Sequence, residues 1–197
     1  MKNYETMPDE QLVQFSLKNE DCFYFLIKRY EIKLIRYIKQ ITIVCQEEAE
    51  DICQEIFIKV YRNLNDFDQK LLFSSWIYRI AHNEVINHYR KNKLLSKTIS
   101  LDIVNSSGNS LASLLYDPLD IHEKYTSKKK AETVRKTLAI LPEKYREILV
   151  LRYLEDKSYK EIGDILRKPK GSVATLIKRA KSKFKKQAET INLMDKY

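Results

Sequence analysis

The sequence predicts an all-α protein, and three observations support that prediction. Only three Gly and four Pro occur among 197 residues, so strand and turn signals are sparse. Hydrophobic residues make up 44% of the chain and charged residues 32%, which suits amphipathic helices around a core. Apolar residues also recur at helical spacing in several segments. The length allows one larger unit, but the composition favours two small helical domains joined by a flexible linker.

The first domain, residues 1–95, is expected to begin with two core-facing helices. Residues 22–43 contain one apolar stripe at helical spacing. A second helix is expected over 47–65, because apolar residues recur there at the same period. Its first turns are rich in acids, which favour the positive end of the helix dipole. Cys53 falls on the apolar side of this helix and is interpreted as a small core residue.

A third helix is expected over 76–93, after a loop in which Ser74 or Ser75 would act as the helix cap. Polar and basic side chains follow one another along it at spacings of three, four and one, so they share one outward face. These residues are Arg79, Asn83, Asn87, Arg90 and Lys91. The exposed side of this helix is therefore expected to be polar and basic.

Residues 96–127 are expected to form the linker, because Ser, Asn, Asp and Gly replace the helical period there. Helical periodicity returns in a second domain over 128–190. Within it, Ser158 followed three residues later by Glu161 predicts a capping box and the start of a helix. The sequence RKPKG ends that helix within a few residues, and a longer helix follows.

Two helices joined by a tight turn, the second basic outside and apolar inside, are typical of a helix-turn-helix. Between Leu166 and Gln187 there are nine basic residues and no acidic one. So many uncompensated cations would repel one another on a merely solvated helix, and they favour DNA binding, as does the net charge of +9. The residues expected at base edges are Ser172, Thr175, Lys178 and Arg179, and those expected at phosphates are Lys170, Lys181 and Lys185.

Three segments resemble a known family in order and spacing. LPEKYREILVLRYLEDKSYKEIGDILRKPKGSVATLIKRAKSKFKK resembles the C-terminal region of bacterial RNA polymerase sigma factors of the extracytoplasmic-function type. AEDICQEIFIKVYRNLNDFD resembles the polymerase-binding helix of that family, and SSWIYRIAHNEVINHYRKNK resembles its promoter-opening helix. The resemblance covers roughly residues 9–187 and is weakest in the linker.

The resemblance implies a sigma subunit, which directs core RNA polymerase to promoter DNA. The first domain would dock on the polymerase and open the minus-10 element, while the second would read the minus-35 element as duplex. The implied polymerase contacts are Asp51, Gln54 and Glu55. The polar face of the third helix would hold the minus-10 bases together with aromatic residues, because aromatic rings can stack on unpaired bases. The aromatic candidates are Phe67, Phe73, Trp76 and Tyr89, although a Trp at a helix start is more often a core residue. An anti-sigma factor is a further implied partner.

Two residues depart from the family pattern. Asn87 stands where the promoter-opening helix commonly has Asp, which leaves the preferred minus-10 sequence open. Ser172 stands where the recognition helix commonly has Thr after its Gly, so the hydroxyl is kept.

Other classes of protein find less support in the sequence. A stand-alone helix-turn-helix regulator would share the basic helix, but no separate dimerisation element is visible. No enzyme motif, metal-ligand spacing or cofactor motif is found, and the three histidines match no metal site. An odd number of cysteines without a CxxC pair predicts a reducing cytoplasm. No apolar run has the length of a membrane span, so no membrane contact is expected.

Overall fold

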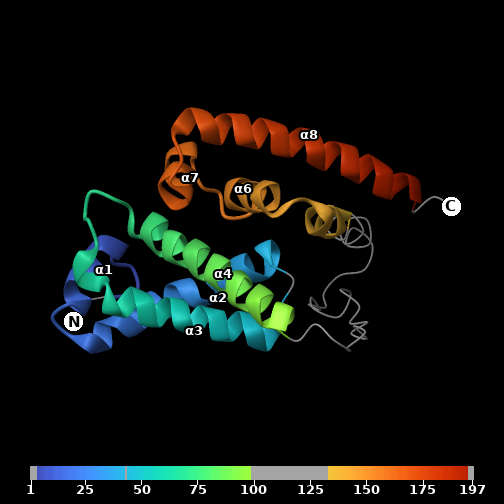
Figure 1. Ribbon diagram of the computed structural model, residues 1–197. Coiled ribbons are helices and arrows are strands. Elements are labelled where there is room, and N and C mark those ends of the chain that lie inside the picture. Colours follow the sequence, from blue (N-terminus) through green and yellow to red (C-terminus); the bar gives the residue numbers. More distant parts are fainter. Residues whose placement is uncertain (1–3, 43, 99–132, 195–197) are drawn as a thin grey trace, which may run out of the picture.

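The computed structural model describes residues 4–42, 44–98 and 133–194, and every regular element within them is helical. All but the first three residues of the predicted linker, 96–127, lie outside the described residues. In Figure 1 the described helices form two layers, with α1 to α4 in one and α6 to α8 in the other. The predicted all-α class is confirmed.

Four α-helices and two short 3-10 helices build the first layer. They are α1 (Asp9–Ser16), η1 (Glu20–Cys22), α2 (Phe23–Ile41), α3 (Gln46–Arg62), η2 (Leu64–Asp66) and α4 (Phe73–Thr98). The apolar stripe predicted for α2 is buried: Leu26, Leu34 and Ile38 are fully inaccessible to solvent. Helix α1 was not predicted, although its Leu12 and Val13 are equally buried. An apolar pair in an eight-residue helix is too short a signal for a periodicity argument.

The start of α4 differs from the prediction. The helix begins at Phe73, three residues before the expected start, and neither predicted serine caps it. The backbone N–H groups of Ser75 and Trp76 donate instead to the carbonyl of Leu72, at 3.0 and 3.1 Å. The Ser75 hydroxyl is buried without a hydrogen-bond partner among the described residues. The cap prediction was therefore wrong. Phe73 is buried in the core and is the first residue of α4, so both serines lie within the first turn and not at the cap position.

The second layer contains the helix-turn-helix. Residues 133–140 are helical, followed by α6 (Glu143–Tyr153), α7 (Tyr159–Leu166) and α8 (Lys170–Met194). The capping box at the start of α7 is confirmed: the Ser158 hydroxyl accepts from the Glu161 N–H at 3.2 Å, and the Ser158 N–H donates to the Glu161 carboxylate at 2.9 Å. The inner face of α8 is also confirmed, with Val173 and Ala180 fully buried.

The turn between α7 and α8 depends on Gly163 and not on the glycine of RKPKG. The left-handed residue that ends α7 is Arg167, with φ 52°. A Cβ atom on Gly163 would lie 2.8 Å from the carbonyl oxygen of Lys168, a clash with backbone. A Cβ atom on Gly171, inside α8, would meet nothing within 4 Å. The close approach of the turn therefore requires glycine at 163 alone.

Exchanging these two glycines for alanine should have opposite effects on stability. Gly163→Ala should destabilise the second layer by about 1–3 kcal/mol, the usual range for overpacking, because backbone must move. Gly171→Ala should be neutral or stabilising by up to about 1 kcal/mol, because alanine is the better helix former. Urea unfolding of both variants measures the difference, and equal stability of the two would contradict this account of the turn.

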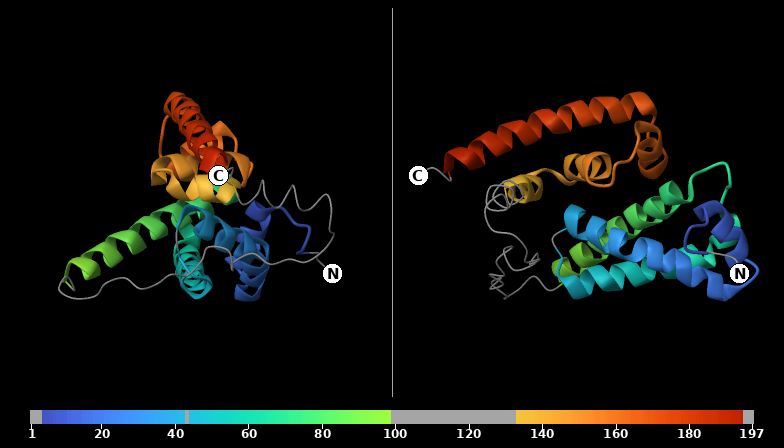
Figure 2. Two further views of the ribbon diagram at one scale, coloured as in Figure 1. Left: turned by 90° about the vertical axis from the view of Figure 1, so that its right-hand side faces the viewer. Right: turned by 180° about the vertical axis from the view of Figure 1, so that it is seen from behind.

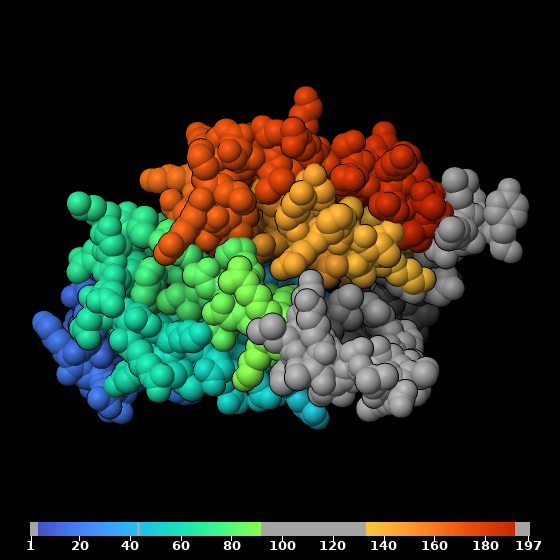
Figure 3. All heavy atoms as spheres, viewed as in Figure 1, coloured from blue at the N-terminus to red at the C-terminus, as the bar shows by residue number. Residues whose placement is uncertain are grey.

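The two layers pack directly on each other. Helix α7 lies against α4, and α6 lies against α2. Figure 2 shows from two further sides that the α6–α8 layer lies on one side of the first layer. In Figure 3 the atoms of α4 touch those of the second layer. The fold therefore brings the helix-turn-helix against the helix that is expected to open promoter DNA.

Candidate nucleic-acid and polymerase interfaces

Helix α8 presents the predicted DNA-reading residues to solvent. All seven predicted minus-35 residues are exposed: Lys170, Ser172, Thr175, Lys178, Arg179, Lys181 and Lys185. Opposite them, the buried face packs on α6 and α7. The helix therefore has the division that a recognition helix needs, with cations outward and apolar residues inward.

Two residues of this face already have partners within the chain. The Thr175 hydroxyl donates to the carbonyl of Gly171 at 3.0 Å, which leaves its methyl group and an acceptor lone pair for DNA. The Lys181 amine lies 5.1 Å from the ring centroid of Tyr153 in α6. Lys181 therefore lies on the side of the exposed face that adjoins α6.

The predicted polar face of α4 is exposed along most of its length. Asn83, Asn87, Arg90 and Lys91 are all accessible. Arg79 differs, because it is half-buried and its Nε donates to the carbonyl of Asp164 in α7 at 2.7 Å. The first cation of the predicted minus-10 face is therefore held by the helix-turn-helix in this arrangement.

Phe67 and Phe73 require a correction. Both rings were expected to stack on unpaired bases, but Phe67 is only 7% exposed and Phe73 is 0% exposed. Phe73 points to the core because it lies one turn before the buried Ile77 on the same side of α4. Its ring centroid is 5.6 Å from those of Tyr30 and Phe67, in edge-to-face packing. In this arrangement both rings stabilise the loop before α4 and cannot reach a base.

Helix α3 presents the predicted polymerase-binding residues. Asp51, Gln54 and Glu55 are exposed, and no ion pair neutralises the two acids within the described part of the chain. Ile58 continues the same face, one turn after Gln54, with 42% of its surface exposed. Sequence reasoning missed Ile58, because an apolar residue in an amphipathic helix is assigned to the core by default.

The contact between the layers centres on the buried carboxylate of Glu147 in α6. Its Oε1 accepts a hydrogen bond from the Tyr37 hydroxyl of α2 at 2.6 Å. The same oxygen lies 2.6 Å from Nδ1 of His82 in α4. Burial, and then the nearby Glu147 carboxylate, raise the pKa of Tyr37 well above its usual value, so Tyr37 stays a hydrogen-bond donor. One acid of the second layer thus joins two helices of the first.

Further polar contacts surround Glu147. The Tyr78 hydroxyl of α4 donates to Glu155, and the Lys157 amine lies 4.7 Å from the ring centroid of Tyr78. Burial lowers the pKa of Lys157, and the neighbouring acids Glu161 and Glu155 offset this in part. The Arg146 guanidinium donates to the carbonyl of Ile41 at 3.2 Å. No local sequence pattern predicts these contacts between the layers, because the two residues that each one joins are at least 65 positions apart.

The described part of the chain is all-helical and contains a helix-turn-helix, a polar face on α4 and an acidic face on α3. These are features of a transcription protein that binds both DNA and another protein. Comparison with known proteins defines the class. Residues 26–94 match the family Sigma-70 region 2, and residues 131–184 match the family Sigma-70, region 4.

Curated relatives narrow the class. The chain is 32% identical over 184 residues to the ECF RNA polymerase sigma factor SigW of Bacillus subtilis, covering 93% of this chain and 97% of the relative. It is 29% identical over 178 residues to the ECF RNA polymerase sigma-E factor of Escherichia coli K12, covering 90% and 92%. The chain belongs to the extracytoplasmic-function (ECF) family of RNA polymerase sigma factors. It therefore acts in promoter-specific initiation of transcription.

Solved structures share the fold. The structure of CnrH in complex with the cytosolic domain of CnrY has a TM-score of 0.66 and 21% identity, and covers 92% of this chain and 97% of that one. The sigma factor RpoE of Bartonella quintana, solved with the anti-sigma factor NepR, has a TM-score of 0.65 and 18% identity, with coverage of 85% and 96%. Among the described helices of the present chain, none is long and apolar enough to cross a membrane.

Proposed function

We propose that three exposed helix faces divide the work of this sigma factor. The face of α3 formed by Asp51, Gln54 and Glu55 docks on core RNA polymerase. The face of α4 formed by Asn83, Asn87, Arg90 and Lys91, joined by Arg79 once α7 has moved away, reads and opens the minus-10 element. The predicted face of α8 reads the minus-35 element.

The observation that most supports this division is the exposure of α8 cations over a buried apolar face, within the stretch that matches region 4. Phosphate contacts from such cations position a recognition helix, and base contacts from its first turns specify the site. The acidic face of α3 and the polar face of α4 both fall in the stretch that matches region 2. Phe67 and Phe73 are left out, because both are buried.

The described arrangement is a closed state in this proposal. Elements centred about 25 base pairs apart are separated by roughly 85 Å of B-DNA. In the closed state α7 contacts both α4 and α8. Packed helix axes lie about 8–10 Å apart, so α4 and α8, the two DNA-reading helices, are separated by roughly 20 Å. The layers must therefore separate before one molecule can reach both elements.

Weakening the contact at Glu147 should favour the open state. Tyr37→Phe removes one hydrogen bond to a buried carboxylate, which is worth about 1–3 kcal/mol, so the closed-to-open ratio should fall about five- to 150-fold. Spin labels on Cys45 and on a cysteine at Lys186→Cys would report the separation. Cys45 is exposed, whereas Cys22 and Cys53 are buried, and burial together with Glu31 and Glu50 raises the pKa of Cys53 to about 12.

Tyr61→Phe is the matched control, because Tyr61 is 42% exposed on α3 and lies outside the contact between the layers. The distance between the two spin labels should be the same in the Tyr61→Phe variant as in the parent chain. If Tyr37→Phe also left the separation distribution unchanged, Glu147 would not hold the closed state.

Membership of the family supports a proposal for the partners and the location. We infer that the chain binds core RNA polymerase and promoter DNA in the cytoplasm, and that the chemistry of RNA synthesis belongs to the polymerase. The solved relatives CnrH and RpoE were each found in a complex, with CnrY and with the anti-sigma factor NepR respectively. An anti-sigma factor is accordingly a further proposed partner, and no cofactor or metal is needed for these roles.

DNA binding with and without core polymerase separates this proposal from a stand-alone regulator. The closed chain alone should bind promoter duplex weakly, and addition of core polymerase should strengthen binding because it fixes the separation of the two DNA-reading faces. Fluorescence anisotropy of a labelled promoter fragment measures both affinities. Tight binding by the chain alone, unchanged by core polymerase, would instead identify a stand-alone helix-turn-helix regulator.

A further inference from the structure

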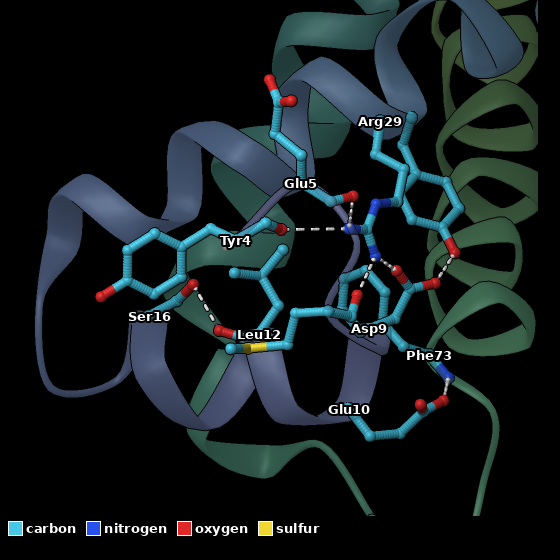
Figure 4. Close-up of polar contacts among 10 residues, drawn as sticks. Tyr4, Glu5, Asp9, Glu10, Leu12, Ser16, Arg29 and Phe73 are labelled. Carbon is cyan, nitrogen blue, oxygen red and sulfur yellow. Dashed lines mark hydrogen bonds and ion pairs between the residues drawn. The ribbon is translucent and has the colours of Figure 1, made fainter. Parts of the chain in front are cut away.

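The segment that precedes α2 has no role in the three proposed faces, yet it is tied firmly to the fold. In Figure 4 the Arg29 guanidinium of α2 points into a ring of acceptors from residues 4–9. It donates to the carbonyls of Met7 at 2.9 Å and Glu5 at 3.0 Å, and it forms an ion pair with Asp9. The second carboxylate oxygen of Asp9 accepts from the Tyr30 hydroxyl. These contacts fix the first turn of α1 on α2.

The next residue of α1 reaches a different helix. The Glu10 carboxylate accepts a hydrogen bond from the backbone N–H of Phe73 at 3.1 Å, at the first residue of α4 (Figure 4). No acidic residue lies in the first turn of α4 itself, so Glu10 supplies from outside the negative charge that a helix N-terminus favours. It thereby acts in place of the serine cap that the sequence predicted.

Asp9 and Glu10 therefore link α2 to the start of α4 through two adjacent side chains. The Tyr30 ring, whose hydroxyl is held by Asp9, also packs edge-to-face on the buried Phe73 ring. The polar and aromatic contacts converge on the residue where the loop over 67–72 becomes helix α4. Loss of the Glu10 carboxylate would remove the polar contact at the first residue of α4.

We propose that Glu10 is a positioning residue for promoter opening, and this inference rests on the proposed role of α4. Long Lys and Arg side chains can follow phosphates through small displacements, so duplex binding tolerates a looser α4. Holding an unpaired base requires a fixed surface, because the base must be received in one place and orientation. Loss of the Glu10 cap should therefore impair the opening of DNA more than the binding of duplex.

The test compares two templates with reconstituted polymerase holoenzyme containing the full chain. One template is fully paired, and the other carries a mismatched, already open minus-10 region. Glu10→Ala should lower transcription from the paired template about three- to thirtyfold, the range expected from loss of a helix cap. On the open template it should transcribe as well as the parent chain. Glu10→Gln keeps an acceptor oxygen and should restore most of the activity on the paired template.

Lys28→Ala is the matched control, because Lys28 pairs with Glu5 on the surface of the same segment and does not contact α4. It should leave both templates unaffected. An unchanged paired-template rate for Glu10→Ala, or an equal loss on both templates, would overturn the inference. Should Glu10→Ala fail to fold, Glu10→Asp shortens the acceptor by one methylene and faces the same criteria. A parent chain that is inactive on both templates would instead contradict the proposed function.

Discussion

Replacing Asp51 and Glu55 together with lysine should abolish detectable binding to core RNA polymerase. Both acids are exposed on α3 and lie four residues apart, so the change reverses a row of like charge on one face. Truncating one partner of a charge pair buried in an interface costs about 2–5 kcal/mol, and reversal adds repulsion. We expect at least a hundredfold loss of affinity in a binding titration of labelled chain with core polymerase.

The fold of this variant should be intact, since no described ion pair depends on either acid. A control with the same change in net charge is Asp21→Lys with Glu31→Lys, which alters two exposed acids of the same layer that lie outside α3, in η1 and α2. The control should bind polymerase with nearly unchanged affinity. Equal losses in the two double variants would show that net charge, and not the α3 face, governs binding.

Replacing Lys178 and Arg179 with alanine should remove dependence on the minus-35 element. Both residues lie in the exposed N-terminal half of α8, over the buried residues Val173 and Ile177. A specific contact from Arg or Lys to a base is worth about 1–3 kcal/mol, so the double variant should lose roughly a hundredfold in transcription from a two-element promoter. The rate should then resemble that of the parent chain on a promoter with a scrambled minus-35 element.

The matched control removes two lysines from the C-terminal half of the same helix, by Lys183→Ala and Lys186→Ala. Lys183 lies 5.6 Å from the ring centroid of Tyr145, on the side toward α6. This control should keep its preference for the minus-35 element while losing some salt-sensitive affinity. Retained minus-35 dependence in the Lys178 and Arg179 variant would contradict the proposed reading face.

The helices and the helix-turn-helix could be predicted because their signals are local. The apolar period of α2 repeats over nineteen residues, and every third or fourth residue faces the core as expected. The Ser158 and Glu161 capping box needs only three residues of spacing, and it forms as predicted. The inner face of α8 follows from the same period, so the exposure of its cations could be inferred as well.

The errors arose where distant segments decide the local structure. Phe67 and Phe73 are buried because Tyr30 and Trp76 complete an aromatic cluster that no local pattern encodes. The cap of α4 comes from Glu10, 63 residues earlier. Arg79 is held by a carbonyl 85 residues later, in the other layer. The requirement for glycine at 163 likewise appears only when the turn brings the Lys168 carbonyl close.

The most direct test of the sigma-factor account maps RNA 5′ ends made in a purified system. The chain would be added to sigma-free core RNA polymerase on fragmented genomic DNA. We predict starts that require the chain and that share two upstream elements at a fixed spacing. Absence of chain-dependent starts with an active cognate core, together with tight palindromic duplex binding by the chain alone, would contradict the account.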